Sequence, residues 1–313
     1  MTAIRDALTQ YIIVRRALGT RLQEPARTLG YFVDFLEHKK ATFITISLAL
    51  RWACEPKNVQ RATWARRLSM VRRFAAWLNV FDPRTEVPPK RLLNARHRRN
   101  KPYIYNSQEI QRLMAEASRL PSPTGLRART YTTLIGLLAV TGLRPGEALA
   151  LNMSDVDLHN GILSIRQTKF GKSRFVPIEN STLIALEDYA KQRNKLCAYL
   201  QTDSFLVSER GTQLLSGSAR RTFAKVSQMI GLRPRIEGRR VGRGPRLQDF
   251  RHTFATRRLI EWYQDGLDVK RELPKLTTYL GHANLNNTYW YIEAVPELLQ
   301  LATEQIYQKE GAR

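Results

Sequence analysis

The sequence predicts a mainly α-helical protein of two domains that carries one small β-hairpin. Its 313 residues exceed a single small domain, since a domain holds roughly 150 residues. Apolar residues recur at helical spacing, and two short segments rich in β-formers, 161–165 and 174–178, flank a Lys-Phe-Gly-Lys turn. With 43% hydrophobic and 25% charged residues, the chain has the composition of a globular protein that buries a core.

The first domain, residues 1–90, is predicted to be a small helical bundle. Leu29, Phe32 and Leu36 illustrate its helical spacing. The clearest helix, 59–80, carries an apolar stripe, and four arginines lie mostly off that stripe: Arg66, Arg67, Arg72 and Arg73. These arginines either contact the phosphates of a nucleic acid or form an ordinary solvated face.

A basic linker, residues 91–105, is predicted to join the domains, because prolines end the helical pattern before it. The second domain, 106–313, opens with Asn106 and Glu109 at the spacing of a capping box. It closes with an amphipathic tail helix, 297–309, which can pack on its own domain or on a neighbouring copy.

The distribution of charge predicts double-stranded DNA as the partner. The chain has 51 Lys+Arg against 27 Asp+Glu, a net charge of +24. Residues 1–100 hold 20 basic and 7 acidic residues, and residues 211–260 hold 12 and 2. A uniformly basic surface is the alternative, but one block of charge in each domain favours two surfaces that hold a polyanion. The DNA contacts predicted outside the 59–80 helix are Arg98, Arg99, Lys172, Arg239, Arg240 and Arg243.

Several classes of protein and site are not expected. The sequence lacks the ~20 continuous apolar residues of a membrane span, and its start lacks a signal-peptide core. A cytoplasmic protein with no membrane partner is therefore predicted. Cys54 and Cys197 do not have the spacing of metal ligands or of a disulfide framework. The carboxylates of 147–157 are not joined by a second acidic motif, which disfavours a metal-dependent nuclease.

The segment 141–147, Thr-Gly-Leu-Arg-Pro-Gly-Glu, presents an arginine between two expected helices. One helix is expected to end at Gly142, just before Arg144. An arginine at this point can donate two hydrogen bonds to a phosphate, and Glu147, one turn later, could hold the guanidinium. Taken alone, an arginine near a helix end more often serves the carbonyl groups of that helix.

Four further residues follow in a fixed order: Lys169 at the hairpin tip, Arg251 in Asp-Phe-Arg-His-Thr, His282 in Leu-Gly-His, and Tyr291 in Thr-Tyr-Trp-Tyr. With Arg144, this set resembles the phage-integrase or Xer-like family of tyrosine site-specific recombinases over about residues 106–300. The N-terminal domain resembles the core-DNA-binding domain of that family in helical pattern and charge. The stretch from Trp262 to Tyr291 is similar to recombinases encoded by bacterial transposable elements.

The resemblance implies an enzyme that cleaves and rejoins DNA through a 3′-phosphotyrosyl intermediate, in integration, excision or resolution. It assigns the nucleophile to Tyr291, with Tyr289 as the rival in this segment, and matches the acidic partner of the family to Glu147. Because the covalent intermediate keeps the bond energy, no cofactor is implied, and no Gly-x-x-x-x-Gly-Lys-Ser/Thr motif occurs. A tetramer on DNA, alone or with sister recombinases, is also implied.

The remaining matched residues surround the scissile phosphate in such enzymes. Arg144 and Arg251 would hold its non-bridging oxygens as negative charge grows there. Lys169 would protonate the departing 5′ oxygen, with Lys172 in reserve. His282 would bind a phosphate oxygen or move a proton.

One position departs from the resemblance. Gln248 stands three residues before Arg251, where the family usually has a histidine. Glutamine keeps a hydrogen-bond donor but does not titrate. Its presence leaves open a catalytically inactive DNA-binding regulator of the same fold. A type IB topoisomerase shares the chemistry, but the small helical first domain disfavours it. His252, directly after Arg251, is expected to be structural.

Overall fold

The computed structural model describes residues 3–20, 22–94, 101–166, 173–197, 200–234, 244–282, 284–294, 297–301 and 303. The chain divides into two compact units, which we call the N-terminal unit (Met1–Asn100) and the C-terminal unit (Lys101–Arg313). This division falls inside the segment predicted as a linker, 91–105. None of the helices in the described ranges is long and apolar enough to cross a membrane.

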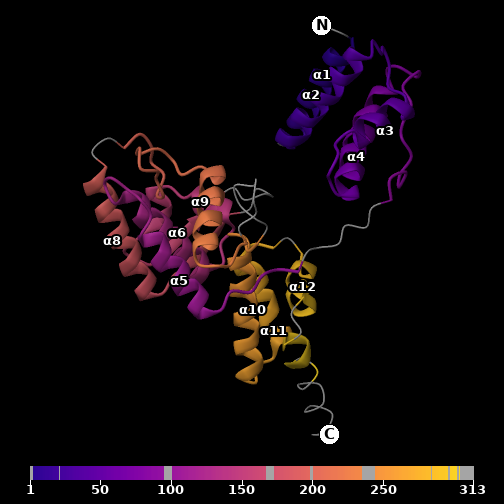
Figure 1. Ribbon diagram of the computed structural model, residues 1–313. Coiled ribbons are helices and arrows are strands. Elements are labelled where there is room, and N and C mark those ends of the chain that lie inside the picture. The colour runs from indigo at the N-terminus through magenta and orange to yellow at the C-terminus, as the bar shows by residue number, and fades with distance from the viewer. Residues whose placement is uncertain are drawn as a thin grey trace. The chain divides into compact units, whose positions relative to one another are not determined.

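The N-terminal unit is a helical bundle (Figure 1), and its hydrophobic core combines aliphatic side chains with aromatic rings. Its described helices are α1 (Ala3–Ala17), α2 (Gln23–His38), α3 (Ile46–Cys54) and α4 (Arg61–Leu78). The ring centroids of Phe32 and Trp52 lie 5.0 Å apart, and those of Tyr11 and Phe74 lie 5.4 Å apart. The apolar stripe predicted on α4 faces this core through Leu68, Val71 and Leu78, which are all buried.

The C-terminal unit is mostly helical and contains a three-stranded antiparallel sheet. Its described helices are α5 (Ser107–Ser118), α6 (Leu126–Thr141), α7 (Pro145–Leu149), a 3-10 turn (Met153–Asp155), α8 (Asn180–Leu196), α9 (Ser216–Met229), α10 (Asp249–Gln264), α11 (Val269–Leu280) and α12 (Asn286–Ala294). The strands are β1 (Val156–Asp157), β2 (Ile162–Ile165) and β3 (Arg174–Pro177), in the order β1-β2-β3. β2 and β3 form the predicted hairpin, with Leu163 opposite Val176. β1 is too short to leave a periodic signal in the sequence.

Helix α10 connects two hydrophobic clusters of this unit. It packs against α6, whose Leu134 and Leu138 are fully buried among α5 and α8. It also packs against α11 and α12 around a second cluster that includes Leu259 and Leu273. Figure 1 shows α10, α11 and α12 side by side. Residues carried by α10 can therefore meet residues from both clusters.

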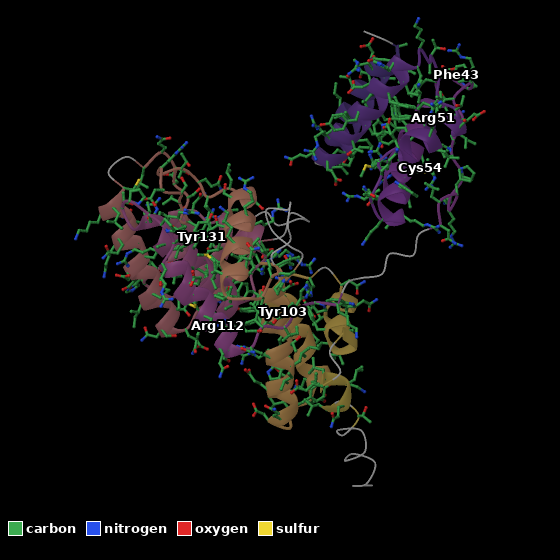
Figure 2. The ribbon with its side chains drawn as sticks, in the orientation of Figure 1. Phe43, Arg51, Cys54, Tyr103, Arg112 and Tyr131 are labelled. Atoms are coloured by element: carbon green, nitrogen blue, oxygen red, sulfur yellow. The ribbon has the colours of Figure 1, made fainter. Side chains whose placement is uncertain are left out.

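The last residues before α5 pack on α10 as part of the C-terminal unit. Tyr105 is 1% exposed, and its ring stacks on Phe250 with centroids 4.4 Å apart. Tyr103, labelled in Figure 2, donates a hydrogen bond to Glu109 at 2.5 Å. Glu109 and Asn106 form the capping box predicted at the start of α5.

Candidate active site

Arg144 lies at the junction of α6 and α7. α6 is capped by Gly142 with a φ of 61°, a left-handed conformation that favours glycine. A side chain at Gly142 would also lie 2.6 Å from the ring of Phe254. Arg144 Nη1 donates to Glu147 Oε1 at 2.6 Å, and the Arg144 backbone N–H donates to Glu147 Oε2 at 3.1 Å. Glu147 therefore contacts the guanidinium in the way that the spacing predicts.

Arg251 lies in the first turn of α10 with its side chain fully buried. Its Nη1 donates to Gly142 O at 3.0 Å, and its Nη2 donates to Leu280 O. Arg144 Nη2 donates to the next carbonyl, Gly281 O, at 3.2 Å. The ends of α6 and α11 thus bring the two arginines together. Burial lowers the pKa of Arg251 to about 10, so the group is still a cation at neutral pH.

His282 follows Gly281, which caps α11 with a φ of 66°. Its Nδ1 lies 2.8 Å from Thr288 Oγ1, and its ring centroid lies 5.9 Å from that of Tyr291. Burial, followed by the positive charges of Arg251 and Arg144, lowers the pKa of His282 to about 3. The imidazole is therefore neutral at neutral pH.

Tyr291 lies on α12 and is only 2% exposed, whereas Tyr289 is 44% exposed. The ring of His252, on α10, lies 5.3 Å from the ring of Tyr291 and 5.2 Å from that of Trp290, centroid to centroid. Burial lowers the pKa of His252 to about 4. This contact with the predicted nucleophile has no signal in the sequence beyond the position of His252 next to Arg251.

Arg174, the first residue of β3, belongs to this cluster although no sequence motif singles it out. Its Nη2 lies 2.8 Å from Glu147 Oε2, so one carboxylate binds both Arg174 and Arg144. The sequence shows only a basic residue at the start of a strand, after a turn that contains lysines. Basic residues in such places are usually exposed to solvent, so this signal does not indicate a site.

Gln248 is half-buried immediately before α10, and its carbonyl accepts the backbone N–H of Arg251 at 3.2 Å. Its side chain does not cap the helix. Seven predicted site residues lie outside the described residues: Lys169, Lys172, Arg98, Arg99, Arg239, Arg240 and Arg243.

The four arginines of α4 differ in their surroundings. Arg67 turns inward: its guanidinium carbon lies 3.8 Å from the ring centroid of Trp52, and its Nη2 donates to Trp52 O at 2.8 Å. Burial lowers the pKa of Arg67. Arg72 donates to a backbone carbonyl at 2.9 Å. Arg66, which pairs with an acidic residue of α2, and Arg73 are the exposed members of the set.

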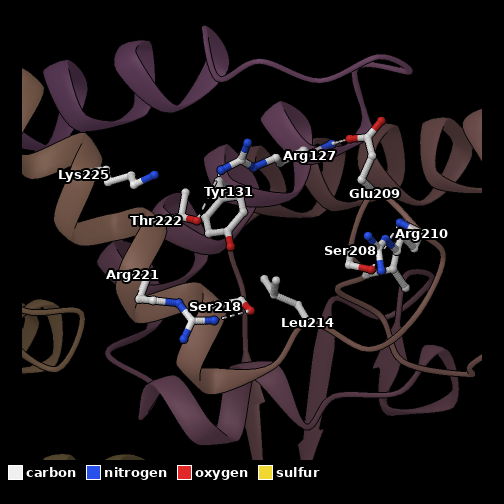
Figure 3. Close-up of a pocket in the computed structure, with 11 residues that line it drawn as sticks. Arg127, Tyr131, Ser208, Glu209, Arg210, Leu214, Ser218, Arg221, Thr222 and Lys225 are labelled. Atoms are coloured by element: carbon white, nitrogen blue, oxygen red, sulfur yellow. Dashed lines mark hydrogen bonds between the residues drawn. The ribbon is translucent and has the colours of Figure 1, made fainter. Parts of the chain in front are cut away.

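A separate basic pocket lies between α6, α9 and the loop before α9 (Figure 3). Arg127, Arg221 and Lys225 line it. Glu209, at its edge, accepts the backbone N–H groups of Thr124 and Arg127, each at 2.9 Å, together with two hydroxyl groups. Although burial opposes ionisation, these hydrogen bonds lower the pKa of Glu209 to about 2. Glu209 thus caps the start of α6, the helix whose other end leads to Arg144.

The cluster around Arg144 and Arg251 combines cations with a hydroxyl group and a neutral imidazole. Two guanidiniums can bind the oxygens of a phosphodiester, and a tyrosine in the same cluster can attack its phosphorus. Within the described ranges, no group of three or more His, Cys, Asp and Glu is placed to hold a metal ion. This fold and this site define a tyrosine recombinase, an enzyme that cuts and rejoins DNA strands.

Comparison with known proteins identifies the family. Residues 104–297 match the model of the phage integrase family, and the chain belongs to that family. A relative named "Putative integrase/recombinase y4rB", from Sinorhizobium fredii, is 44% identical over 99% of this chain and 98% of its own length. Tyrosine recombinase XerD of Neisseria meningitidis serogroup A is 30% identical over 77% of this chain and 75% of its own length.

Solved structures share the fold at low sequence identity. A structure of the Tn1549 transposon integrase with a circular intermediate DNA has a TM-score of 0.65 and 14% identity, and covers 93% of this chain and 95% of its own. A lambda integrase dimer bound to a core site has a TM-score of 0.62 and 16% identity over the same shares of the two chains.

Proposed function

We propose that this recombinase acts at a specific DNA site through a 3′-phosphotyrosyl bond formed by Tyr291, in the integration, excision or resolution of a DNA segment. The observation that carries the proposal is the meeting of Arg144, Arg251, His282 and Tyr291 from four separate parts of the C-terminal unit.

In the proposed reaction, the phenolic oxygen of Tyr291 bonds to phosphorus, and the bond between phosphorus and the 5′ oxygen breaks. The phenol gives its proton to the neutral imidazole of His282 or to water, and the leaving oxygen receives a proton from Lys169. Rejoining reverses these steps, so no external energy source is needed. Tyr291 is 2% exposed in the free chain, and we propose that α12 shifts when DNA binds so that the hydroxyl reaches the phosphate.

Arg144 and Arg251 stabilise the charge that develops on the non-bridging oxygens. Each guanidinium carries five N–H donors, so the hydrogen bonds to Gly142, Leu280 and Gly281 leave other donors for a phosphate. Backbone carbonyls orient both groups before substrate arrives, which reduces reorganisation during the reaction. Gln248, close to Arg251 in the chain, is proposed to donate a hydrogen bond in place of a histidine.

We also propose that residues 1–100 supply half of the DNA-binding surface, with Arg66 and Arg73 as contacts. The predicted contacts Lys172, Arg98, Arg99, Arg239, Arg240 and Arg243 belong to the same proposal. Arg67 and Arg72 are proposed mainly to support the bundle, because both are half-buried and donate to backbone carbonyls within it, whereas Arg66 and Arg73 are exposed. The working form proposed is a tetramer on double-stranded DNA in the cytoplasm, alone or with sister recombinases.

The test is a covalent trap on DNA that the enzyme itself selects. Wild-type protein first enriches its binding sequence from a random duplex library, and that sequence is rebuilt with a nick beside the cleaved position. Wild type should leave a protein–DNA adduct on a denaturing gel. Tyr291→Phe should bind equally and leave none, while the control Tyr289→Phe should trap normally. A chain that binds the selected duplex but never traps would be the inactive regulator, and the reverse result for the two tyrosines would move the nucleophile to Tyr289.

A further inference from the structure

Arg174 makes a two-point contact with the largely buried carboxylate of Glu147. Its Nη2 lies 2.8 Å from Glu147 Oε2, and its Nη1 lies 3.3 Å from Glu147 Oε1. The side chains of Arg174 and Glu147 are 10% and 9% exposed. Forked contacts of this kind fix the plane of a carboxylate as well as its position.

The same two carboxylate oxygens hold Arg144. Oε1 accepts Arg144 Nη1 at 2.6 Å, and Oε2 accepts the Arg144 backbone N–H at 3.1 Å. Burial opposes the ionisation of Glu147, yet its pKa is lowered, first by Arg174 and then by Arg144. Arg174 therefore does more than Arg144 to keep the Glu147 carboxylate ionised, and that carboxylate orients Arg144.

The other side of Arg174 contacts the segment that leads to His282. Its Nε donates to Tyr279 O at 2.7 Å. A side chain at Gly281 would lie 2.8 Å from Arg174 Nη1, so the guanidinium lies directly against this turn. Gly281 O is also the acceptor for Arg144 Nη2. One guanidinium thus contacts both partners that hold Arg144 in place.

The balance of charge gives Arg174 a second role. Arg144 and Glu147 alone form a neutral pair, which attracts a phosphate weakly. Arg174 offsets the carboxylate, so the group of three carries one net positive charge. In a buried site, where water screens little, that charge raises the attraction of Arg144 for the reacting phosphate.

We propose that Arg174 is a positioning residue that acts through Glu147, holding Arg144 in its orientation and keeping its positive charge available to the scissile phosphate. This inference rests on the proposed function, because it presumes cleavage of a phosphodiester at Arg144. Arg174 itself need not touch the DNA.

The experiment compares single-turnover cleavage by the full chain on the selected nicked duplex. Arg174→Gln removes the positive charge and keeps a hydrogen-bond donor. Arg174→Lys keeps the charge and loses the two-point contact with the carboxylate. The matched control is Arg193→Lys, because Arg193, on α8, is also an arginine of low exposure, 3%, and its Nη2 donates to Ser204 O at 2.8 Å. Rates are divided by the fraction of each protein that binds DNA, which removes losses due to misfolding.

We expect Arg174→Gln to cleave about 10- to 100-fold more slowly than wild type, by analogy with the loss seen when residues that orient the ligands of a metal site are replaced. Arg174→Lys should lose less, and Arg193→Lys should stay within about threefold. A duplex with an uncharged methylphosphonate at the scissile position supplies the decisive readout. With no anionic charge to attract, the deficit of Arg174→Gln should shrink to within about threefold.

An equal deficit on phosphate and methylphosphonate would overturn the inference, as would a wild-type rate in Arg174→Gln. A comparable loss in Arg193→Lys would show a general effect of removing a buried arginine and would overturn it too. Failure of the proposed function is distinguishable, because in that case wild type itself would form no adduct. If Arg174→Gln does not fold, Arg174→Ala, which also removes the charge, takes its place in the comparison between the two substrates.

Discussion

Acid should destabilise the C-terminal unit through His282, and the size of the effect follows from its surroundings. Burial and the neighbouring guanidiniums lower its pKa from 6.5 to about 3. In the unfolded chain the imidazole therefore binds a proton near pH 6.5, whereas in the folded chain it stays neutral until the pH approaches 3. The stabilising effect of the neutral ring is complete above pH 6.5 and is lost progressively as the pH falls toward 3.

At pH 5 the solution is 1.5 units below the ordinary pKa of histidine, 6.5. At 1.36 kcal/mol per unit, the free energy of unfolding falls by up to about 2 kcal/mol between neutral pH and pH 5. Because the ring is half-buried, solvent screening reduces this to about 1–2 kcal/mol. His252, with a pKa lowered to about 4, should add a similar loss. The free energy needed to unfold the region around α10 and α12, here called the opening free energy, should therefore fall by about 2–4 kcal/mol in wild type between pH 7.5 and 5.

Native-state hydrogen exchange of α10 and α12 amides, corrected for the intrinsic effect of pH on exchange, measures this free energy. His282→Gln should lose about 1–2 kcal/mol less than wild type over the same range. His159→Gln, at an exposed position, is the control and should follow wild type. Equal pH dependence in wild type and His282→Gln would refute the reasoning. The neutral ring also predicts that the cleavage-rate ratio of these two proteins stays constant from pH 6 to 8.

Three further results are expected. Glu209→Gln should lower the opening free energy of α6 by about 1–2 kcal/mol at pH 7. This difference from wild type should vanish as the pH falls from about 4.5 to 2, because the carboxylate of wild type is then protonated. The control Asp188→Asn, which breaks an exposed ion pair to the same helix, should change the opening free energy by less than about 0.5 kcal/mol. Gln248→Ala should slow cleavage by about 100-fold, the loss of one donor to a developing oxyanion, without changing DNA affinity; an unchanged rate would remove Gln248 from the site. DNA binding should weaken with salt, with a slope of about −0.9 per contacted phosphate in a plot of log binding constant against log salt concentration. A 101–313 fragment should show a shallower slope than the full chain. Equal slopes would exclude residues 1–100 from the DNA-binding surface.

The sequence by itself determined the features whose signals lie within a few neighbouring residues. Asn106 and Glu109 form the expected capping box because both partners lie in one turn of helix. α6 ends at Gly142 because a glycine tolerates the left-handed conformation of a helix cap. The hairpin forms where two β-rich segments flank a short turn. The order of the predicted catalytic residues is likewise a property of the chain alone.

Only the tertiary structure decided which distant groups meet. Arg251 donates to carbonyls at both Gly142 and Leu280, and Arg174, on strand β3, reaches Glu147 on helix α7. Arg67, which the helical pattern of α4 places among possible DNA contacts, instead lies over Trp52. These contacts depend on how helices pack and on which buried donors need acceptors, and no local spacing encodes either condition. The sequence can therefore identify which arginine matters, but because its side chain is long and flexible, only the packing of the fold determines which group it contacts.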